Sequence, residues 1–160
     1  MKQQKKADVL ITVQGQKDLQ KELDELKNVK LPAVMDRVAK AREEGDLSEN
    51  SAYQFGKQEQ EFLEGRIDEL EEVLKNATLV DNTNKTSSKN NIDIGCQVTV
   101  NINGKKQVFT VVGDWEANPA EKKISASSPL GKALIGKKIG DHAEVDAPAG
   151  KVIYTVVEIV

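Results

Sequence analysis

The sequence predicts an α+β protein made of two unlike halves, and three observations support this prediction. From Gly15 to about Ala77, apolar residues recur every three or four positions, which is typical of amphipathic helices. From about residue 94 onward, apolar and β-branched residues alternate or form short runs, which is typical of strands. Between the two halves, residues 81–93 are polar and almost free of apolar side chains, which predicts a linker.

Of the 160 residues, 31% are charged and 4% are aromatic. This composition is typical of a protein with long solvent-exposed helices and a small hydrophobic core. The first 80 residues carry 13 basic and 17 acidic side chains, and the last 80 carry 10 and 9. Neither half has the positive excess of a protein that holds a nucleic-acid duplex mainly by its phosphates. The single cysteine excludes an intramolecular disulfide and a multi-cysteine zinc site. No signal peptide or membrane span is indicated, so we expect a cytoplasmic protein.

The helical half, residues 1–80, is predicted to be an antiparallel coiled-coil hairpin. Pro32 falls inside the first arm, where it should kink the helix or restart it at a first-turn position. A short polar segment around Gly45 separates the arms, and arms of about 28 residues extend about 40 Å. The tip is therefore expected at about residues 44–50. Apolar residues of the second arm are Ala52, Phe55 and Phe62, followed by a heptad stripe of Leu63, Ile67, Leu70, Leu74 and Ala77.

The second domain, residues 94–160, is predicted to be a small antiparallel sheet packed on one short helix. Asn103-Gly104 and Ala149-Gly150 are turn signals between strands. The last run is apolar enough to be a central strand. In the helix, Ser128 suits the N-cap, Pro129 the first helical position and Gly136 the C′ position. The expected strands lie within residues 96–102, 107–113, 122–127, 142–147 and 151–160.

The expected tip contains four carboxylates within seven residues, in the stretch EEGDLSENS at residues 43–51. One interpretation is structural: Asp46 as N-cap and Glu49 three positions later have the form of a capping box, and acidic groups suit a helix N-terminus. The other is chemical, because carboxylates are ligands that Mg²⁺ prefers. Two carboxylates on an exposed tip need further ligands from a partner molecule. The residues alone leave both interpretations open.

Several basic residues lie within about fifteen positions of the tip, and four of them we call the basic collar: Arg37, Lys40, Arg42 and Lys57. A basic collar behind an acidic tip could hold a phosphate backbone while the acids meet a metal. Helix solubility and pairing between residues four apart explain the same charges equally well. In the second domain, Trp115 lies in a loop between strands, as a lid on the sheet edge or as an exposed anchor for a partner.

Two stretches in each half resemble the Gre family of bacterial transcript-cleavage factors, of the GreA type. In the first half these are AREEGDLSENSAY and EGRIDELEEVL; in the second they are GDWEAN and ISASSPLGKALIGKKIGD. The resemblance covers residues from about 11 to 160, in the same order and spacing. The GDLSENSAY segment is specific to the family.

The resemblance implies a protein that binds bacterial RNA polymerase and is not an enzyme by itself. It implies an FKBP-like second domain that docks at the rim of the secondary channel, while the hairpin enters the channel. The family's acidic pair matches Asp46 and Glu49, which would help to hold a Mg²⁺ shared with the polymerase while the polymerase cleaves the 3′ end of backtracked RNA. No cofactor is expected in the free protein, which would act as a monomer. The family's RNA-contacting residues match Arg42 and Lys57, and its docking region corresponds to Ser128 and Pro129.

Two departures and one rival hypothesis accompany this resemblance. Position 48 is Ser where some members have a basic residue, and position 57 is Lys where others have Arg. Lys cannot make the bidentate phosphate contact of Arg, so a weaker grip on RNA is expected. The alternative function is a non-catalytic coiled-coil adaptor or chaperone-like protein, or a related protein that enters the polymerase channel and inhibits.

Overall fold

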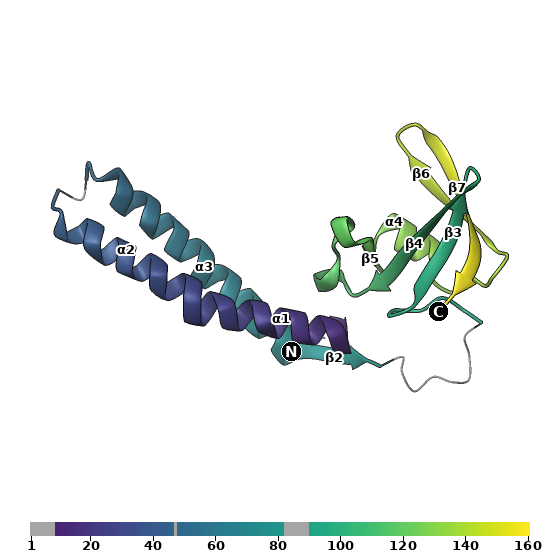
Figure 1. The fold of residues 1–160 in the computed structure, drawn as a ribbon, viewed down its shortest axis with the longest axis horizontal. Helices are drawn as coiled ribbons and strands as arrows, with labels where there is room; N and C mark the ends of the chain where they lie inside the picture. The colour runs from purple at the N-terminus through teal and green to yellow at the C-terminus, as the bar shows by residue number, and fades with distance from the viewer. Residues whose placement is uncertain (1–8, 47, 82–89) are drawn as a thin grey trace, which may run out of the picture. The chain divides into compact units, whose positions relative to one another are not determined.

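A computed structural model describes residues 9–46, 48–81 and 90–160 of the chain. The chain forms two compact units. One unit is the helical segment Gln16–Asn76. The other unit contains Ala77–Val160, with the C-terminal sheet, together with the chain up to Gly15. Figure 1 shows the elements of each unit.

The helical unit is the predicted antiparallel hairpin. Its first arm runs through α1 (Val13–Glu25), a π-helical turn (Leu26–Lys30) and α2 (Leu31–Glu43), and its second arm is α3 (Ser51–Asn76). The arms lie side by side in Figure 1 and are in contact along α2 and α3. The buried apolar side chains between Gln16 and Asn76 are Leu19, Leu23, Leu26, Val34, Ala41, Leu63, Ile67, Leu70 and Val73.

Two parts of the predicted apolar pattern in the second arm are wrong. Phe55 and Phe62 are 66% and 73% exposed. Each directly precedes a buried residue, Gly56 or Leu63, and successive helical positions point about 100° apart. The two rings therefore lie on the flank of the hairpin. Ala77 does not continue the helix, because it is the first residue of a strand.

Pro32 lies in the first turn of α2, as the sequence predicts for a restart, but the chain before it is already helical. The backbone N–H of Leu31 donates to the carbonyl of Leu26, five residues earlier, which is the π-helical pattern. Pro32 then lies in the first turn of α2 and has no N–H to donate to the carbonyls of the π-helical turn before it. The wider turn thus lets the chain continue past the proline without a break.

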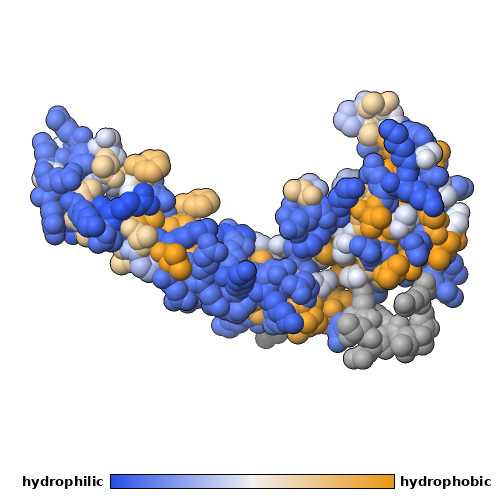
Figure 2. Space-filling model, viewed as in Figure 1, coloured by the Kyte–Doolittle hydropathy of each residue, from blue (hydrophilic) through white to orange (hydrophobic). Residues whose placement is uncertain are grey.

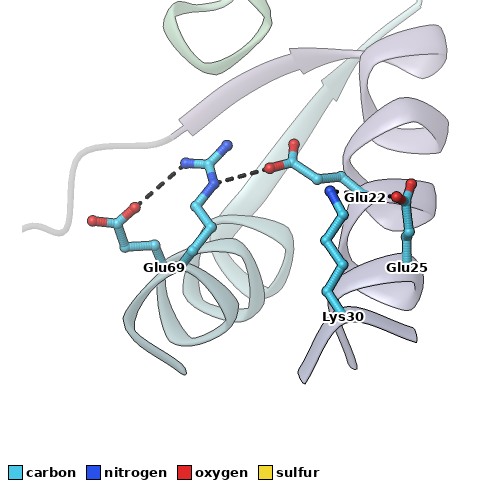
Figure 3. A network of polar contacts seen from close by, with 5 residues as sticks. Glu22, Glu25, Lys30 and Glu69 are labelled. Carbon is cyan, nitrogen blue, oxygen red and sulfur yellow. Dashed lines mark hydrogen bonds and ion pairs between the residues drawn. The ribbon is translucent and has the colours of Figure 1, made fainter. Parts of the chain in front are cut away.

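Ion pairs connect the two arms at their exposed edges. Arg66 Nε lies 3.0 Å from Glu22 Oε1 on the opposite arm. Arg66 Nη1 lies 3.4 Å from Glu69 Oε2 on its own arm (Figure 3). The hydrogen bond to Glu22 raises the pKa of the Arg66 guanidinium further above its ordinary value. Exposed pairs of this kind contribute about 0–1 kcal/mol each, so they favour one register of the arms more than they stabilise the fold.

A short parallel strand pair, which the sequence analysis missed, joins residues that flank the hairpin. Strand β1 (Val9–Thr12) pairs with β2 (Ala77–Val80), with Val9 opposite Ala77. The Glu116 carboxylate accepts hydrogen bonds from the backbone N–H of Thr12 at 2.9 Å, from the Thr12 hydroxyl and from the N–H of Gly113. This carboxylate attaches the end of β1 to the 3₁₀ turn Asp114–Glu116.

The C-terminal sheet has the strand order β5-β4-β3-β7-β6. All neighbouring pairs are antiparallel except β4 and β5, which are parallel, so the prediction of a purely antiparallel sheet is wrong at that edge. The predicted central position of the last strand is confirmed, because β7 lies between β3 and β6. The bounds are β3 Gln97–Ile102, β4 Lys105–Val112, β5 Lys123–Ser125, β6 His142–Ala147 and β7 Gly150–Ile159.

One short α-helix, α4 (Pro129–Leu134), packs beside the sheet and contributes Leu134 to the core. The other buried core residues here are Ile92, Val98, Val100, Val111, Ala143, Val156 and Ile159. Of the predicted linker 81–93, residues 82–89 lie outside the described residues. Within the described chain, no helix has the length and apolar character needed to cross a bilayer.

Candidate functional site at the hairpin tip

The tip is the segment between the end of α2 at Glu43 and the start of α3 at Ser51, and residue 47 in it lies outside the described residues. Gly45 has a φ of 91°, a left-handed conformation that suits glycine and ends the first arm. The N–H of Glu49 donates to the carbonyl of Asp46 at 3.3 Å, which closes a tight turn. Both acidic side chains are exposed to solvent.

The predicted capping box is wrong, because Asn50 is the N-cap of α3. The Asn50 side-chain oxygen accepts a hydrogen bond from the N–H of Tyr53 at 3.1 Å, and the Asn50 carbonyl accepts the first helical bond from Gln54 at 3.1 Å. Asp46 and Glu49 therefore precede the helix and cap nothing in it. The signal for Asn50 was present in the sequence, because asparagine is among the strongest N-cap residues and stands directly before the helical run.

The carboxylates of Asp46 and Glu49 are thus left for another role. Among the described residues, the Asp46 carboxylate accepts one hydrogen bond, from the Ser48 hydroxyl at 2.8 Å. Within the described residues, the Glu49 carboxylate has no hydrogen bond or ion pair. Figure 2 shows a mainly hydrophilic surface at this end of the hairpin. These two solvated carboxylates remain free to coordinate a metal ion or to accept hydrogen bonds from another molecule.

The four residues of the basic collar are not equivalent in the structure. Arg37 pairs with Glu59 at 2.7 Å, and Lys40 pairs with Asp36 at 2.8 Å. The hydrogen bond to Asp36 raises the pKa of Lys40.

Arg42 and Lys57 differ from this pair, because neither has an ion pair or side-chain hydrogen bond among the described residues. Arg42 is exposed in the last turn of α2, and Lys57 is half-buried in the second turn of α3. The structure thus leaves these two cations available to an anionic partner and neutralises the other two.

The donor set of the tip fits a shared metal ion and not a complete site. Among the residues that the structure describes, no group of three or more His, Cys, Asp or Glu side chains could hold a metal ion. Mg²⁺ takes six oxygen ligands in near-octahedral geometry. Asp46 and Glu49 could supply carboxylate oxygens, and the remaining ligands would have to come from water and a partner.

The second predicted site, around Ser128, is built as the sequence indicates. The Ser128 hydroxyl accepts a hydrogen bond from the N–H of Gly131 at 3.0 Å, as an N-cap, and donates to the carbonyl of Ser125 at 2.6 Å. Pro129 follows as the first helical residue and is exposed. Gly136 lies in the predicted C′ position after α4, with a φ of 81°.

Trp115 follows Asp114, whose carboxylate contacts the loop before α4. The Asp114 carboxylate accepts hydrogen bonds from the hydroxyls of Ser125 and Ser127, the latter at 2.6 Å. These bonds, led by the one from Ser125, lower the pKa of Asp114. The Trp115 side chain is 39% exposed, so it can meet a partner while part of it covers the domain.

Comparison with known proteins connects both sites to one family. The models "Transcription elongation factor, N-terminal" and "Transcription elongation factor, GreA/GreB, C-term" match residues 9–79 and 87–160. The chain is 44% identical over 153 residues to transcription elongation factor GreA of Thermoanaerobacter pseudethanolicus, covering 94% of this chain and 96% of that protein. It is 43% identical over 151 residues to GreA of Rickettsia canadensis, covering 93% and 92%.

A solved structure that resembles the chain is GreA factor homolog 1 of Thermus thermophilus. Its sequence identity is 30%, its TM-score is 0.45, and the match covers 96% of this chain and 99% of that one. The family models and the two GreA relatives cover nearly all of the sequence, including the tip and the region around Ser128. The chain therefore belongs to the GreA/GreB family of transcription elongation factors and is a member of the GreA type.

Proposed function

We propose that this factor binds bacterial RNA polymerase in the cytoplasm and stimulates the polymerase to cleave backtracked nascent RNA, which rescues arrested complexes. The observation that supports this most directly is the freedom of Asp46 and Glu49 at the tip of the hairpin. Their carboxylates are exposed and cap no helix, since Asn50 has that task. In a member of this family, a narrow hairpin with two exposed carboxylates at its end is suited to carry these groups into a channel of the polymerase.

The two compact units would divide the work. The sheet unit, for which we propose an FKBP-like fold, would dock at the rim of the secondary channel through Trp115, Ser128 and Pro129. The protein would act as a monomer. Its hairpin would enter the channel and place the tip near the active site of the polymerase. The factor would therefore not be an enzyme by itself, because hydrolysis would take place at the catalytic centre of the polymerase.

At the tip, Asp46 and Glu49 would supply carboxylate oxygens to a Mg²⁺ ion shared with the polymerase. Such an ion, when bound, activates water and stabilises the charge that develops on a phosphodiester. The Ser48 hydroxyl already orients one oxygen of Asp46 and leaves the other open. Arg42 and Lys57, which carry no partner among the described residues, would bind phosphates at the 3′ end of the extruded RNA.

The test is the pair of substitutions Asp46→Asn and Glu49→Gln, made together in the full chain. The new amide at position 46 would still accept the Ser48 hydrogen bond, and neither residue caps α3, so the thermal unfolding midpoint should stay near that of the wild type. Cleavage of 3′-labelled RNA in stalled polymerase complexes should be lost, because the ligand charge is gone. Glu43→Gln with Glu44→Gln is the matched control and should retain cleavage.

Cleavage at the wild-type rate by the Asp46→Asn, Glu49→Gln protein would exclude the proposed role of the tip. The alternative adaptor or chaperone-like function predicts that neither protein changes the intrinsic cleavage rate of the polymerase. An inhibiting relative would slow intrinsic cleavage by the polymerase, with or without the substitutions. The same assay therefore separates the three functions.

A further inference from the structure

The side-chain amide of Asn50 bonds to both arms of the hairpin. Its oxygen accepts from the N–H of Tyr53 in the first turn of α3, and its nitrogen donates to the carbonyl of Ala41 in the last turn of α2 at 2.8 Å. Carbonyls at a helix C-terminus and N–H groups at a helix N-terminus have no partner within their own helices. One side chain thus satisfies an unpaired group of each arm.

We propose that Asn50 is the positioning residue of the tip, which fixes the direction in which the carboxylates of Asp46 and Glu49 project. This inference rests on the proposed function, because it concerns the aim of the same two carboxylates. Asn50 itself touches neither the metal nor the RNA in this proposal. It acts by closing the segment that carries the acidic pair.

Asn50 closes the loop that carries the acidic pair. Ala41 and Asn50 bracket residues 42–49, which include Arg42, Asp46 and Glu49. The bond from Asn50 Nδ2 to the Ala41 carbonyl holds the two ends of that segment together. Ala41 is only 7% exposed. If the Asn50 amide is removed, little water can therefore reach the Ala41 carbonyl to replace the lost hydrogen bond.

A chain of hydrogen bonds from the same helical turn to Asp46 is the second argument. Gln54 Nε2 donates to the carbonyl of Ser48 at 3.0 Å, and the Ser48 hydroxyl donates to Asp46 Oδ1 at 2.8 Å. The first turn of α3 thus holds the backbone of Ser48, and Ser48 orients the Asp46 carboxylate. The position of that first turn depends on the Asn50 cap.

The close approach of the arms near the tip is the third argument. A methyl group added at Gly56 would lie 2.8 Å from Cγ2 of Val38 on the opposite arm. Only where two helices come this close can a side chain as short as asparagine connect them. Gly56 therefore permits the close approach at which Asn50 bonds to both arms.

The test compares Asn50→Ser with Asn76→Ser in the full chain. Serine keeps an N-cap oxygen for Tyr53 but has no amide that reaches Ala41. Asn76 is the matched control, because its side-chain nitrogen donates to the carbonyl of Glu72 at 2.8 Å in the same helix, far along α3 from the tip. Cleavage of 3′-labelled RNA is measured against factor concentration and against Mg²⁺ concentration.

For Asn50→Ser we expect the cleavage rate at saturating factor to fall by about 10- to 100-fold, as for other misplaced catalytic groups. The half-saturating factor concentration should stay within about twofold of the wild type, since docking is not affected. The Mg²⁺ requirement should rise. Asn76→Ser should match the wild type in all three measurements.

An unchanged maximum rate for Asn50→Ser, or a change confined to the half-saturating concentration, would overturn the inference. If circular dichroism shows that this variant does not fold, Asn50→Asp decides, because it keeps an N-cap oxygen for Tyr53 and removes the donor to the Ala41 carbonyl; a wild-type maximum rate would then overturn the inference. The proposed function fails separately, if the Asp46→Asn, Glu49→Gln protein still stimulates cleavage.

Discussion

At the scale of single residues, the structure divides the basic collar into paired and unpaired cations. Arg37 and Arg42 lie five positions apart in α2, and only Arg37 has a carboxylate partner, Glu59, among the described residues. A cation that already has a partner gains less from an RNA phosphate, because the existing pair must be broken or shared. The two arginines therefore differ in whether the guanidinium is free to bind a phosphate, and not only in their distance from the tip.

Arg42→Ala should reduce cleavage more than Arg37→Ala does. Losing one hydrogen bond to a charged group costs about 1.5–3 kcal/mol, which corresponds to at least about a tenfold loss in the efficiency of cleavage of backtracked RNA. The efficiency is measured as the initial cleavage rate at subsaturating factor. Equal losses for the two variants would show that the Arg37–Glu59 pair opens in the complex.

The same scale shows what the sequence could not decide about the tip. Asp46, Ser48, Asn50 and Ser51 are all acceptable N-cap residues, and Asp46 with Glu49 also fits the capping-box pattern. What selects Asn50 is its second bond, to the Ala41 carbonyl on the other arm. That bond depends on the packing of the hairpin, so no local pattern contains it. Asp46 and Glu49 were predicted as the acidic pair because the sequence motif around them and their place between two helical runs are local features; their role stays a prediction.

At the scale of elements, the long helices and most strands were predictable because each has a sustained period. The hairpin arms, the five strands of the sheet and the cap of α4 by Ser128 follow from such patterns. Strands β1 and β2 did not, because each has four residues and its partner lies more than sixty residues away in the sequence, with Val9 opposite Ala77 and Thr12 opposite Val80. Neither segment carries a period long enough to indicate a strand.

Two glycines of α3 test how closely the arms pack. A methyl group at Gly65 would meet no atom within 4 Å, whereas one at Gly56 would lie 2.8 Å from Val38 Cγ2. Gly65→Ala should raise the free energy of unfolding by about 0.5–1 kcal/mol, since alanine is the better helix former.

Gly56→Ala should lower the free energy of unfolding by about 1 kcal/mol, because overpacking against the stiff Val38 side chain exceeds the same gain in helix propensity. Urea denaturation followed by circular dichroism measures both changes. Stabilisation by both substitutions would mean that the arms can separate at Val38 without cost.

At the scale of the whole molecule, the residues proposed for chemistry and those proposed for docking belong to different compact units. Asp46 and Glu49 lie in Gln16–Asn76, while Trp115, Ser128 and Pro129 lie in the sheet unit. No hydrogen bond among the described residues links Asp46 or Glu49 to these three docking residues. Binding to polymerase and stimulation of cleavage should therefore be separable by mutation.

The separation predicts that the Asp46→Asn, Glu49→Gln protein competes with the wild type for polymerase. If both bind equally well, a tenfold excess of the variant should occupy about nine-tenths of the polymerase and remove about nine-tenths of the stimulated cleavage. Adding Trp115→Ala to the variant should relieve this inhibition, because it removes a side chain proposed for docking and leaves the tip unchanged. Cleavage is measured with a fixed amount of wild-type factor and increasing amounts of each variant. If the Asp46→Asn, Glu49→Gln protein did not inhibit, the acidic pair itself would contribute to binding, and the proposed division of work between the two units would be wrong.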